Sequence, residues 1–201
     1  MTALIEATKQ AGFPAEIVLV LSNKAKAAGL ERAAAEGIAT AALSHRAYAD
    51  REAFDRAMTE RIEASGAELV CLAGFMRLLS PWFCQHWAGR LINIHPALLP
   101  SFKGLDTHQR ALDAGVKIHG ATVHFVVPEM DEGPIIAQAA IPVLPDDTED
   151  TLATRVLAQE HRIYPLGLRL VATGAVRMDN GRACADPGGN PAAALVSPDL
   201  T

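Results

Sequence analysis

The sequence predicts an α/β fold with a mostly parallel, twisted sheet and helices on both faces of that sheet. Short apolar runs alternate with longer segments of helical periodicity, which is the pattern of repeated β–α–β units. A length of 201 residues suits one domain, and half of the chain is apolar while 20% is charged, as in ordinary globular proteins. The net charge of −5 offers no basic field for a nucleic acid, so nucleic acid is not an expected partner.

The first half of the chain predicts three strands separated by helices. Residues 17–21 are entirely apolar, which is typical of a strand covered on both faces, and residues 24–37 are alanine-rich and helical. A weaker strand is expected over 37–43. Between 51 and 65 the residues Phe54, Met58 and Ile62 recur on one helical face. A third strand is expected over 68–73.

The second half continues the alternation and then changes in composition. We expect a short helix beginning near Ser80 and Pro81, and a strand over 91–94. The further expected elements are a helix over about 107–114, strands over 120–127 and 134–143 around a turn at 128–133, and a long helix over 148–172. This order is Rossmann-like. After residue 174 the chain is rich in Gly, Pro and Ala, so we expect one domain over 1–174 and a loose tail over 175–201.

Cysteine usage and hydropathy indicate where the protein works. Cys71, Cys84 and Cys184 are odd in number and form no Cys-x-x-Cys pair, so neither a disulfide framework nor a zinc ribbon is indicated. The apolar run 17–21 is far shorter than the roughly 20 residues of a membrane span. Residues 1–13 lack the features of a signal peptide. We expect a cytoplasmic protein that does not associate with membranes.

The most informative polar residues surround the predicted strand 91–94. Asn93 and His95 are two apart, so they share a face at the carboxyl end of the strand, where ligands bind in open parallel sheets. An amide and an imidazole side by side can donate two hydrogen bonds to one carbonyl oxygen and so stabilise an oxyanion. A carboxylate from Asp131, in the turn at 128–133, would favour the protonated form of His95. Taken singly, a structural histidine and a turn-forming aspartate are the commoner explanations.

The remaining histidines give no metal site. His119 and His124 are separated by an odd number of residues, so on one regular strand they would face opposite ways and make a poor pair of metal ligands. We therefore expect no bound metal.

Six runs of sequence carry a resemblance to a known family. The chain resembles the folate-dependent phosphoribosylglycinamide formyltransferases (GAR transformylases) at Ser-Asn-Lys-Ala (22–25), Leu-Ala-Gly-Phe-Met-Arg-Leu-Leu-Ser (72–80), Asn-Ile-His-Pro-Ala-Leu-Leu-Pro (93–100), His-Gly-Ala-Thr-Val-His-Phe (119–125), Met-Asp-Glu-Gly-Pro (130–134) and Gln-Glu-His-Arg-Ile-Tyr-Pro (159–165). The runs occur in the order expected for the family, between residue 17 and about residue 174.

The resemblance implies a reaction and a catalytic set. In the family, the amino group of the ribotide attacks the formyl carbon of 10-formyltetrahydrofolate directly, without a metal or a covalent enzyme intermediate. Asn93 would hold the formyl oxygen. His95, kept protonated by Asp131, would stabilise the oxyanion and help to pass a proton to the departing folate nitrogen.

The resemblance also implies binding residues and partners. Arg51 could equally be a solvated residue at a helix start, and Glu160 a surface glutamate. Both substrates are small molecules, and a monomer or a homodimer is expected. The folate-binding residues implied are Arg51, Met76, Arg77, Leu78, Leu79, Asn93, Glu129, Met130, Asp131, Glu132 and Gly133, and the ribotide-binding residues implied are Pro96 and Glu160.

The beginning of the chain departs from the family pattern. Family members begin with a strand and a Gly-Ser-Asn loop that cradles the ribotide phosphate at a helix N-terminus. Here residues 1–7 already match the helix after that loop, so we expect the fold to lack its first strand. The interpretation we favour is that Met1 is an internal methionine, because the catalytic set is intact.

Two alternative functions stay open at this point. One is a hydrolase similar to formyltetrahydrofolate deformylase. That enzyme and methionyl-tRNA formyltransferase both carry an extra domain, and neither fits into 201 residues. The other is a folate-binding protein that is inactive because the phosphate loop is absent.

Overall fold

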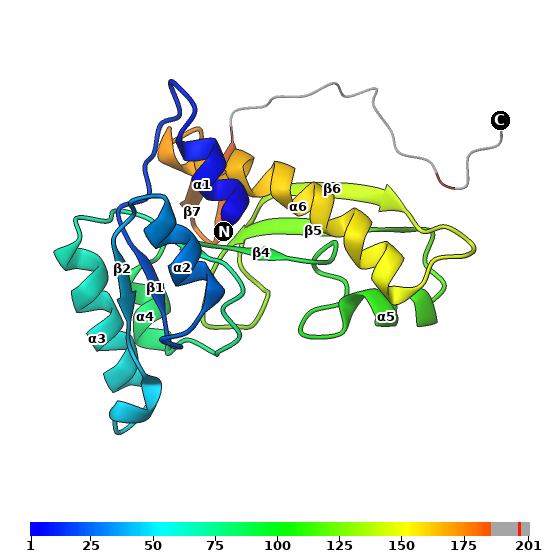
Figure 1. Ribbon diagram of the computed structural model, residues 1–201. Coiled ribbons are helices and arrows are strands. Elements are labelled where there is room, and N and C mark those ends of the chain that lie inside the picture. The colour runs from blue at the N-terminus through cyan, green and yellow to red at the C-terminus, as the bar shows by residue number, and fades with distance from the viewer. Residues whose placement is uncertain (186–196, 198–201) are drawn as a thin grey trace.

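The computed structural model describes residues 1–185 and residue 197. Helices and strands alternate along the chain as far as β5, and α6 is the longest element (Figure 1). The helices are α1 (Thr2–Thr8), α2 (Ala28–Ala35), the 3-10 turn η1 (His45–Ala47), α3 (Arg51–Ala64), α4 (Pro81–His86), α5 (Thr107–Asp113) and α6 (Glu149–Ala172). The strands are β1 (Val20–Ser22), β2 (Thr40–Ala42), β3 (Val70–Leu72), β4 (Leu91–His95), β5 (Ile118–Phe125), β6 (Ile135–Pro142), β7 (Val176–Asp179) and β8 (Arg182–Ala185).

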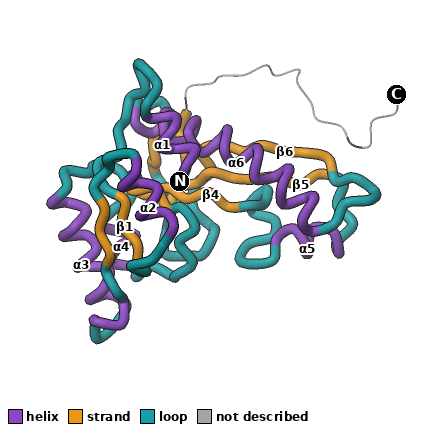
Figure 2. The backbone as a smooth tube through the Cα atoms, viewed as in Figure 1, coloured by secondary structure: helices purple, strands orange, loops and turns teal. Residues whose placement is uncertain are grey.

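The predicted α/β class is confirmed, and the first four strands all pair in parallel. β1 pairs with β2 and β3 pairs with β4, as crossovers through helices require. β5 and β6 then extend the sheet of β3 and β4 in antiparallel pairing, in the order β3-β4-β5-β6. Figure 2 shows the short strands β1 and β2 lying apart from the long strands β5 and β6.

Helices cover both faces of the larger sheet. Neighbouring residues of a strand point in opposite directions, so a strand with consecutive apolar residues contributes to a core on each face. On β4, Ile92 joins the core formed with α1 and α6, where Leu152, Val156 and Leu168 are buried. Leu91 instead joins the second core, formed with α3 and α4. The other buried members of that second core are Phe54, Met58, Phe83 and Trp87.

Capping side chains begin the helices that frame the sheet. Asp50 accepts a hydrogen bond from the Ala53 N–H at 2.8 Å and begins α3. Ser80 caps α4, and Pro81 occupies its first turn as predicted. At α6, Thr148 forms a reciprocal capping box with Thr151.

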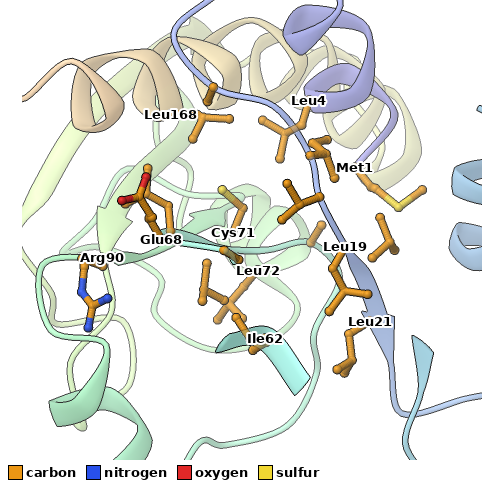
Figure 3. A pocket seen from close by; sticks show the side chains of 18 of the residues that line it. Met1, Leu4, Leu19, Leu21, Ile62, Glu68, Cys71, Leu72, Arg90 and Leu168 are labelled. Atoms are coloured by element: carbon orange, nitrogen blue, oxygen red, sulfur yellow. The ribbon is translucent and has the colours of Figure 1, made fainter. Parts of the chain in front are cut away.

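The sheet is interrupted between β1 and β3. No strand of the described residues lies between them, and the space is a cavity of about 660 Å³. Leu19 and Leu21 line one wall of this cavity and Cys71 the other (Figure 3). Met1 and Leu4 of the N-terminal segment close the cavity near α6. This is the arrangement expected of the fold without a strand at that place.

The segment after α6 differs from its prediction. The prediction of a loose tail was wrong for residues 175–185, because β7 and β8 form an antiparallel hairpin. Val176 is only 3% exposed and packs in the core beneath α6, which holds the hairpin to the domain. The rest of the predicted tail lies outside the described residues, apart from residue 197. Among the described helices, none combines the length and the apolar character that crossing a membrane requires.

Candidate active site

Four polar side chains converge at the carboxyl end of β4, and we call them the polar cluster: Asn93, His95, His124 and Asp131. β4 supplies Asn93 and His95. β5 supplies His124, which lies directly opposite Asn93 in the antiparallel register. Asp131 comes from the turn that joins β5 to β6. The three residues expected from the sequence are therefore brought together, and one more joins them.

Asp131 lies between the two histidines. Its Oδ2 is 3.5 Å from His95 Nδ1, and its Oδ1 is 3.9 Å from His124 Nε2. The Gly104 N–H donates to Oδ2 at 2.8 Å, which fixes the carboxylate. The backbone of Asp131 has a φ of 56°, a left-handed conformation that short polar residues tolerate best. The turn therefore aims the carboxylate back over the end of the sheet.

His95 is held between two acceptors. Its Nε2 lies 3.0 Å from the Phe102 carbonyl oxygen, which can only accept, so Nε2 carries a proton. Its Nδ1 faces the Asp131 carboxylate. The side chains of His95 and Asp131 are only 6% and 12% exposed, so water screens the contact little. Both ring nitrogens of His95 therefore face oxygen acceptors.

His124 is neutral and orients Asn93. Burial lowers the pKa of His124 below its ordinary value, more than the Phe125 carbonyl and Asp131 raise it. Its Nδ1 donates to the Phe125 carbonyl at 2.8 Å, so the bare Nε2 accepts from Asn93 Nδ2 at 3.3 Å. One amide hydrogen of Asn93 is thus engaged, and the second is free to meet a substrate oxygen.

Gly133 permits the close approach of the turn to β5. A Cβ at this position would lie 1.6 Å from the Phe125 carbonyl oxygen and 3.3 Å from His124 Nδ1. Only glycine fits without a shift of the backbone. The resemblance implies that Gly133 contacts folate. In the structure, Gly133 also lets the turn that carries Asp131 pack closely against β5.

The apolar residues expected to bind folate lie on two loops that pack against one core. Leu79, after β3, and Val126, after β5, both pack against the core of α3 and α4. Met76, Leu78 and Met130 on these loops are 76%, 57% and 54% exposed, an unusual exposure for large apolar side chains.

The charged candidates for folate binding lie at the surface around these loops. The Arg77 guanidinium lies 5.7 Å from the centre of the Phe54 ring. Arg51 is exposed at the first turn of α3. Glu129 is exposed, and Glu132 pairs with Lys103 at 2.8 Å.

The two residues expected to bind the ribotide have different surroundings. The Pro96 carbonyl, next to His95, accepts from the Thr107 hydroxyl at 2.8 Å. Glu160 on α6 lies near the amino group of Met1, and partial burial raises its pKa. Glu160 therefore lies beside the amino group of Met1, and within the described residues no hydrogen bond or ion pair joins it to the polar cluster.

The contact between His108 and His119, close to the polar cluster, was not predicted from the sequence. His119 Nε2 lies 3.3 Å from His108 Nδ1, and burial lowers the pKa of His119 to about 4, with smaller contributions from the charges of His108 and His95. His119 and His124 contact different partners, and a bulge interrupts the strand register between Val123 and His124. Within the described part of the chain, no three His, Cys, Asp or Glu residues are grouped as a metal ion would require.

Comparisons with known proteins give the class of this fold and site. Residues 1–168 match the family model described as formyl transferase. The chain belongs to the formyl transferase family.

Within that family the similarity is to a particular enzyme. Phosphoribosylglycinamide formyltransferase of Escherichia coli (strain K12) is 48% identical over 186 residues, which are 92% of this chain and 88% of that protein. Trifunctional purine biosynthetic protein adenosine-3 of Bos taurus is 51% identical over 185 residues. These residues are 92% of this chain but only 18% of that longer protein. The crystal structure of glycinamide ribonucleotide transformylase 1 from Symbiobacterium toebii superposes with a TM-score of 0.87 at 45% identity, covering 92% of this chain and 87% of that one.

Proposed function

We propose that this chain transfers the formyl group of 10-formyltetrahydrofolate to the amino group of phosphoribosylglycinamide in purine biosynthesis. The observation that carries the proposal is the convergence of Asn93, His95 and Asp131, with the His95 imidazole buried between a carboxylate and a carbonyl. The identity of 48% to the Escherichia coli enzyme supports the same reaction.

In the proposed mechanism the three residues act on the formyl group. The free N–H of Asn93 and the Nδ1–H of His95 hold the formyl oxygen while the ribotide amine attacks the formyl carbon. The negative charge that develops on the oxygen is met by the His95 imidazolium, which Asp131 stabilises. His95 then supplies a proton to the departing folate nitrogen, and the proton that the attacking amine releases passes through a water beside Asp131 and restores the His95 imidazolium. A neutral His124 supports this role because it orients Asn93 without adding a competing charge.

The two substrates would meet at the polar cluster. We place the flat pterin of the folate against the exposed apolar side chains of Met76, Leu78 and Met130, and its acidic tail near Arg51 and Arg77. The further proposed contacts of the folate are Leu79, Asn93, Glu129, Asp131, Glu132 and Gly133, and those of the ribotide are Pro96 and Glu160.

The wider setting follows from the same proposal. Residues 1–174 form the formyltransferase domain, and its partners are the two small-molecule substrates rather than nucleic acid or a membrane. The enzyme uses no metal, because imidazolium and amide donors meet the developing charge. It works as a monomer or a homodimer in the cytoplasm, where the free thiols of Cys71, Cys84 and Cys184 stay reduced.

A ribotide-dependent transfer assay tests the function. The purified chain is mixed with 10-formyl folate and phosphoribosylglycinamide, and release of the deformylated folate is followed by absorbance. We expect turnover that needs both substrates. His95→Ala and Asp131→Asn should each lower kcat by about 10²- to 10⁴-fold. His86→Ala, which removes a surface histidine paired with Glu63, serves as the matched control and should keep the wild-type rate.

Two results would contradict the proposal. Release of formate at the same rate with and without ribotide would indicate a deformylase-like hydrolase. Folate binding in calorimetry without any transfer, at ribotide concentrations up to the millimolar range, would indicate a binding protein without turnover.

A further inference from the structure

A buried threonine fastens the turn that follows His95. Thr122 on β5 lies directly opposite His95 in the strand register and is 0% exposed. Its hydroxyl donates to the Ala97 carbonyl at 2.7 Å and accepts from the Leu99 N–H at 3.0 Å. It also accepts from Gln138 Nε2 at 3.0 Å. The one donor and both acceptor positions of the hydroxyl are therefore all used.

Gln138 completes the attachment from the next strand. It lies opposite Thr122 in the register between β5 and β6, and its Nε2 also donates to the Leu99 carbonyl at 3.0 Å. Three backbone groups of the short segment from Ala97 to Leu99 are thus bonded to side chains of the sheet. Loops are ordinarily less constrained than the strands they connect. This one is attached to two strands.

The attached segment leads straight to the groups that hold the polar cluster. A few residues beyond Leu99, the Phe102 carbonyl lies 3.0 Å from His95 Nε2, and the Gly104 N–H donates to Asp131. The positions of these two backbone groups depend on the path of the chain from Ala97 onward. A shift of that path would release both ring contacts of His95 at once.

We propose that Thr122 and Gln138 are positioning residues for the formyl transfer described above. They act through the backbone from Ala97 to Gly104, and no contact with a substrate is required of them. Their hydroxyl and amide set the orientation of the His95 ring and of the Asp131 carboxylate. The inference rests on the proposed function, and it adds two residues on β5 and β6 to the machinery of the site.

A kinetic comparison of matched threonine variants tests this role. Thr122→Val keeps the shape and removes the hydroxyl, and Thr122→Ser keeps the hydroxyl. Thr59→Val is the matched control, since Thr59 is also buried and accepts from Trp87 Nε1 in the core of α3 and α4. We expect Thr122→Val to lower kcat by about 10- to 100-fold with both KM values within about threefold. Thr122→Ser should restore kcat to within about threefold, and Thr59→Val should leave it unchanged.

The outcomes separate a positioning role from a merely structural one. A loss of kcat in Thr59→Val as large as in Thr122→Val would show that general destabilisation is the cause. A loss confined to KM, or no rescue by serine, would overturn the proposal as well. If Thr122→Val does not fold, Gln138→Met removes the bonds to the Leu99 carbonyl and to the Thr122 hydroxyl while Thr122 keeps its own two bonds to the segment, and an unchanged kcat in that variant would also overturn the proposal.

A measurement without substrates distinguishes this inference from the proposed function. In ¹⁵N-histidine NMR, the His95 Nε2 proton bonded to the Phe102 carbonyl should give a slowly exchanging signal. We expect that signal in the wild type and Thr59→Val and its loss in Thr122→Val. Its persistence in Thr122→Val would refute the positioning role. An inactive wild type that shows the signal would refute the proposed function alone.

Discussion

Mild acid should destabilise the protein through His119. This imidazole is 1% exposed, and burial, together with the nearby His108 and His95, lowers its pKa from the ordinary 6.5 to about 4. The unfolded chain therefore binds a proton at a pH where the folded chain does not. The contribution of His119 to stability is complete above pH 6.5 and is lost progressively as the pH falls from about 6.5 to about 4.

The size of the effect follows from the two pKa values of His119. One pKa unit corresponds to about 1.4 kcal/mol, so the shift from 6.5 to about 4 gives a loss of about 2 kcal/mol between pH 7 and pH 5. Burial also lowers the pKa values of His108 and His124, and their contributions have the same sign. The combined loss from these three histidines should therefore exceed that of His119 alone.

Urea unfolding at the two pH values measures this loss directly. The free energy of unfolding is extrapolated to water for the wild type, for His119→Gln and for His161→Gln, whose exposed histidine is the control. The His119 variant should lose about 2 kcal/mol less than the wild type between pH 7 and pH 5. The control should behave as the wild type. Equal losses in all three proteins would refute the argument that burial of His119 makes the fold acid-sensitive.

Three further predictions concern separate parts of the molecule. Thr148→Ala removes the capping box of α6 and should lower the free energy of unfolding in urea by about 1 kcal/mol, whereas no change would contradict the cap. Gly133→Ala should lower the transfer rate, because its Cβ would meet the Phe125 carbonyl at 1.6 Å; wild-type rates would show that the turn adapts. In hydrogen exchange, the amides of Leu21 and Cys71 should exchange faster than those of the central strand β4, because alternation along β1 and β3 directs them into the cavity between the two sheets. Slow exchange at both would mean that these edges are covered.

The predictions from sequence succeeded where local patterns decide the outcome. Fully apolar strands, the Ser80-Pro81 helix start and the start of the long helix at about residue 148 depend on neighbours in the chain, and each lies within a few residues of its expected place. The alignment of Asn93 with His95 depends only on the two-residue period of a strand. The hairpin over 176–185 was missed because Val176 is anchored by tertiary packing beneath α6, which composition does not reveal.

The rest of the site depends on the register between distant strands. His124 meets Asn93, and Thr122 meets the turn after His95, only because β4 and β5 pair antiparallel with these residues opposite one another. The sequence argument that His119 and His124 face opposite ways compares two residues of the same strand. It gives no information about how that strand pairs with β4. The bulge after Val123 skips Ile136 of β6, so it leaves the pairing of His124 with Asn93 unchanged. The signal that could have indicated His124 is its place on the strand leading into the Asp131 turn.

The polar cluster and the interrupted sheet are mechanically separate. Every contact that fixes His95 and Asp131 comes from β4, β5, β6 or the loops between them, which all belong to the continuous four-stranded sheet. The cavity lies on the other side of β3, between its outer edge and β1. A change in the cavity therefore affects first the loops after β1 and β3. The exposed side chains of Met76 and Leu78 lie on the loop after β3, farther from the cavity than β3 itself but not part of the polar cluster. Changes at the cavity should accordingly appear in substrate affinity, while changes at Thr122 or Asp131 should appear in the chemical step.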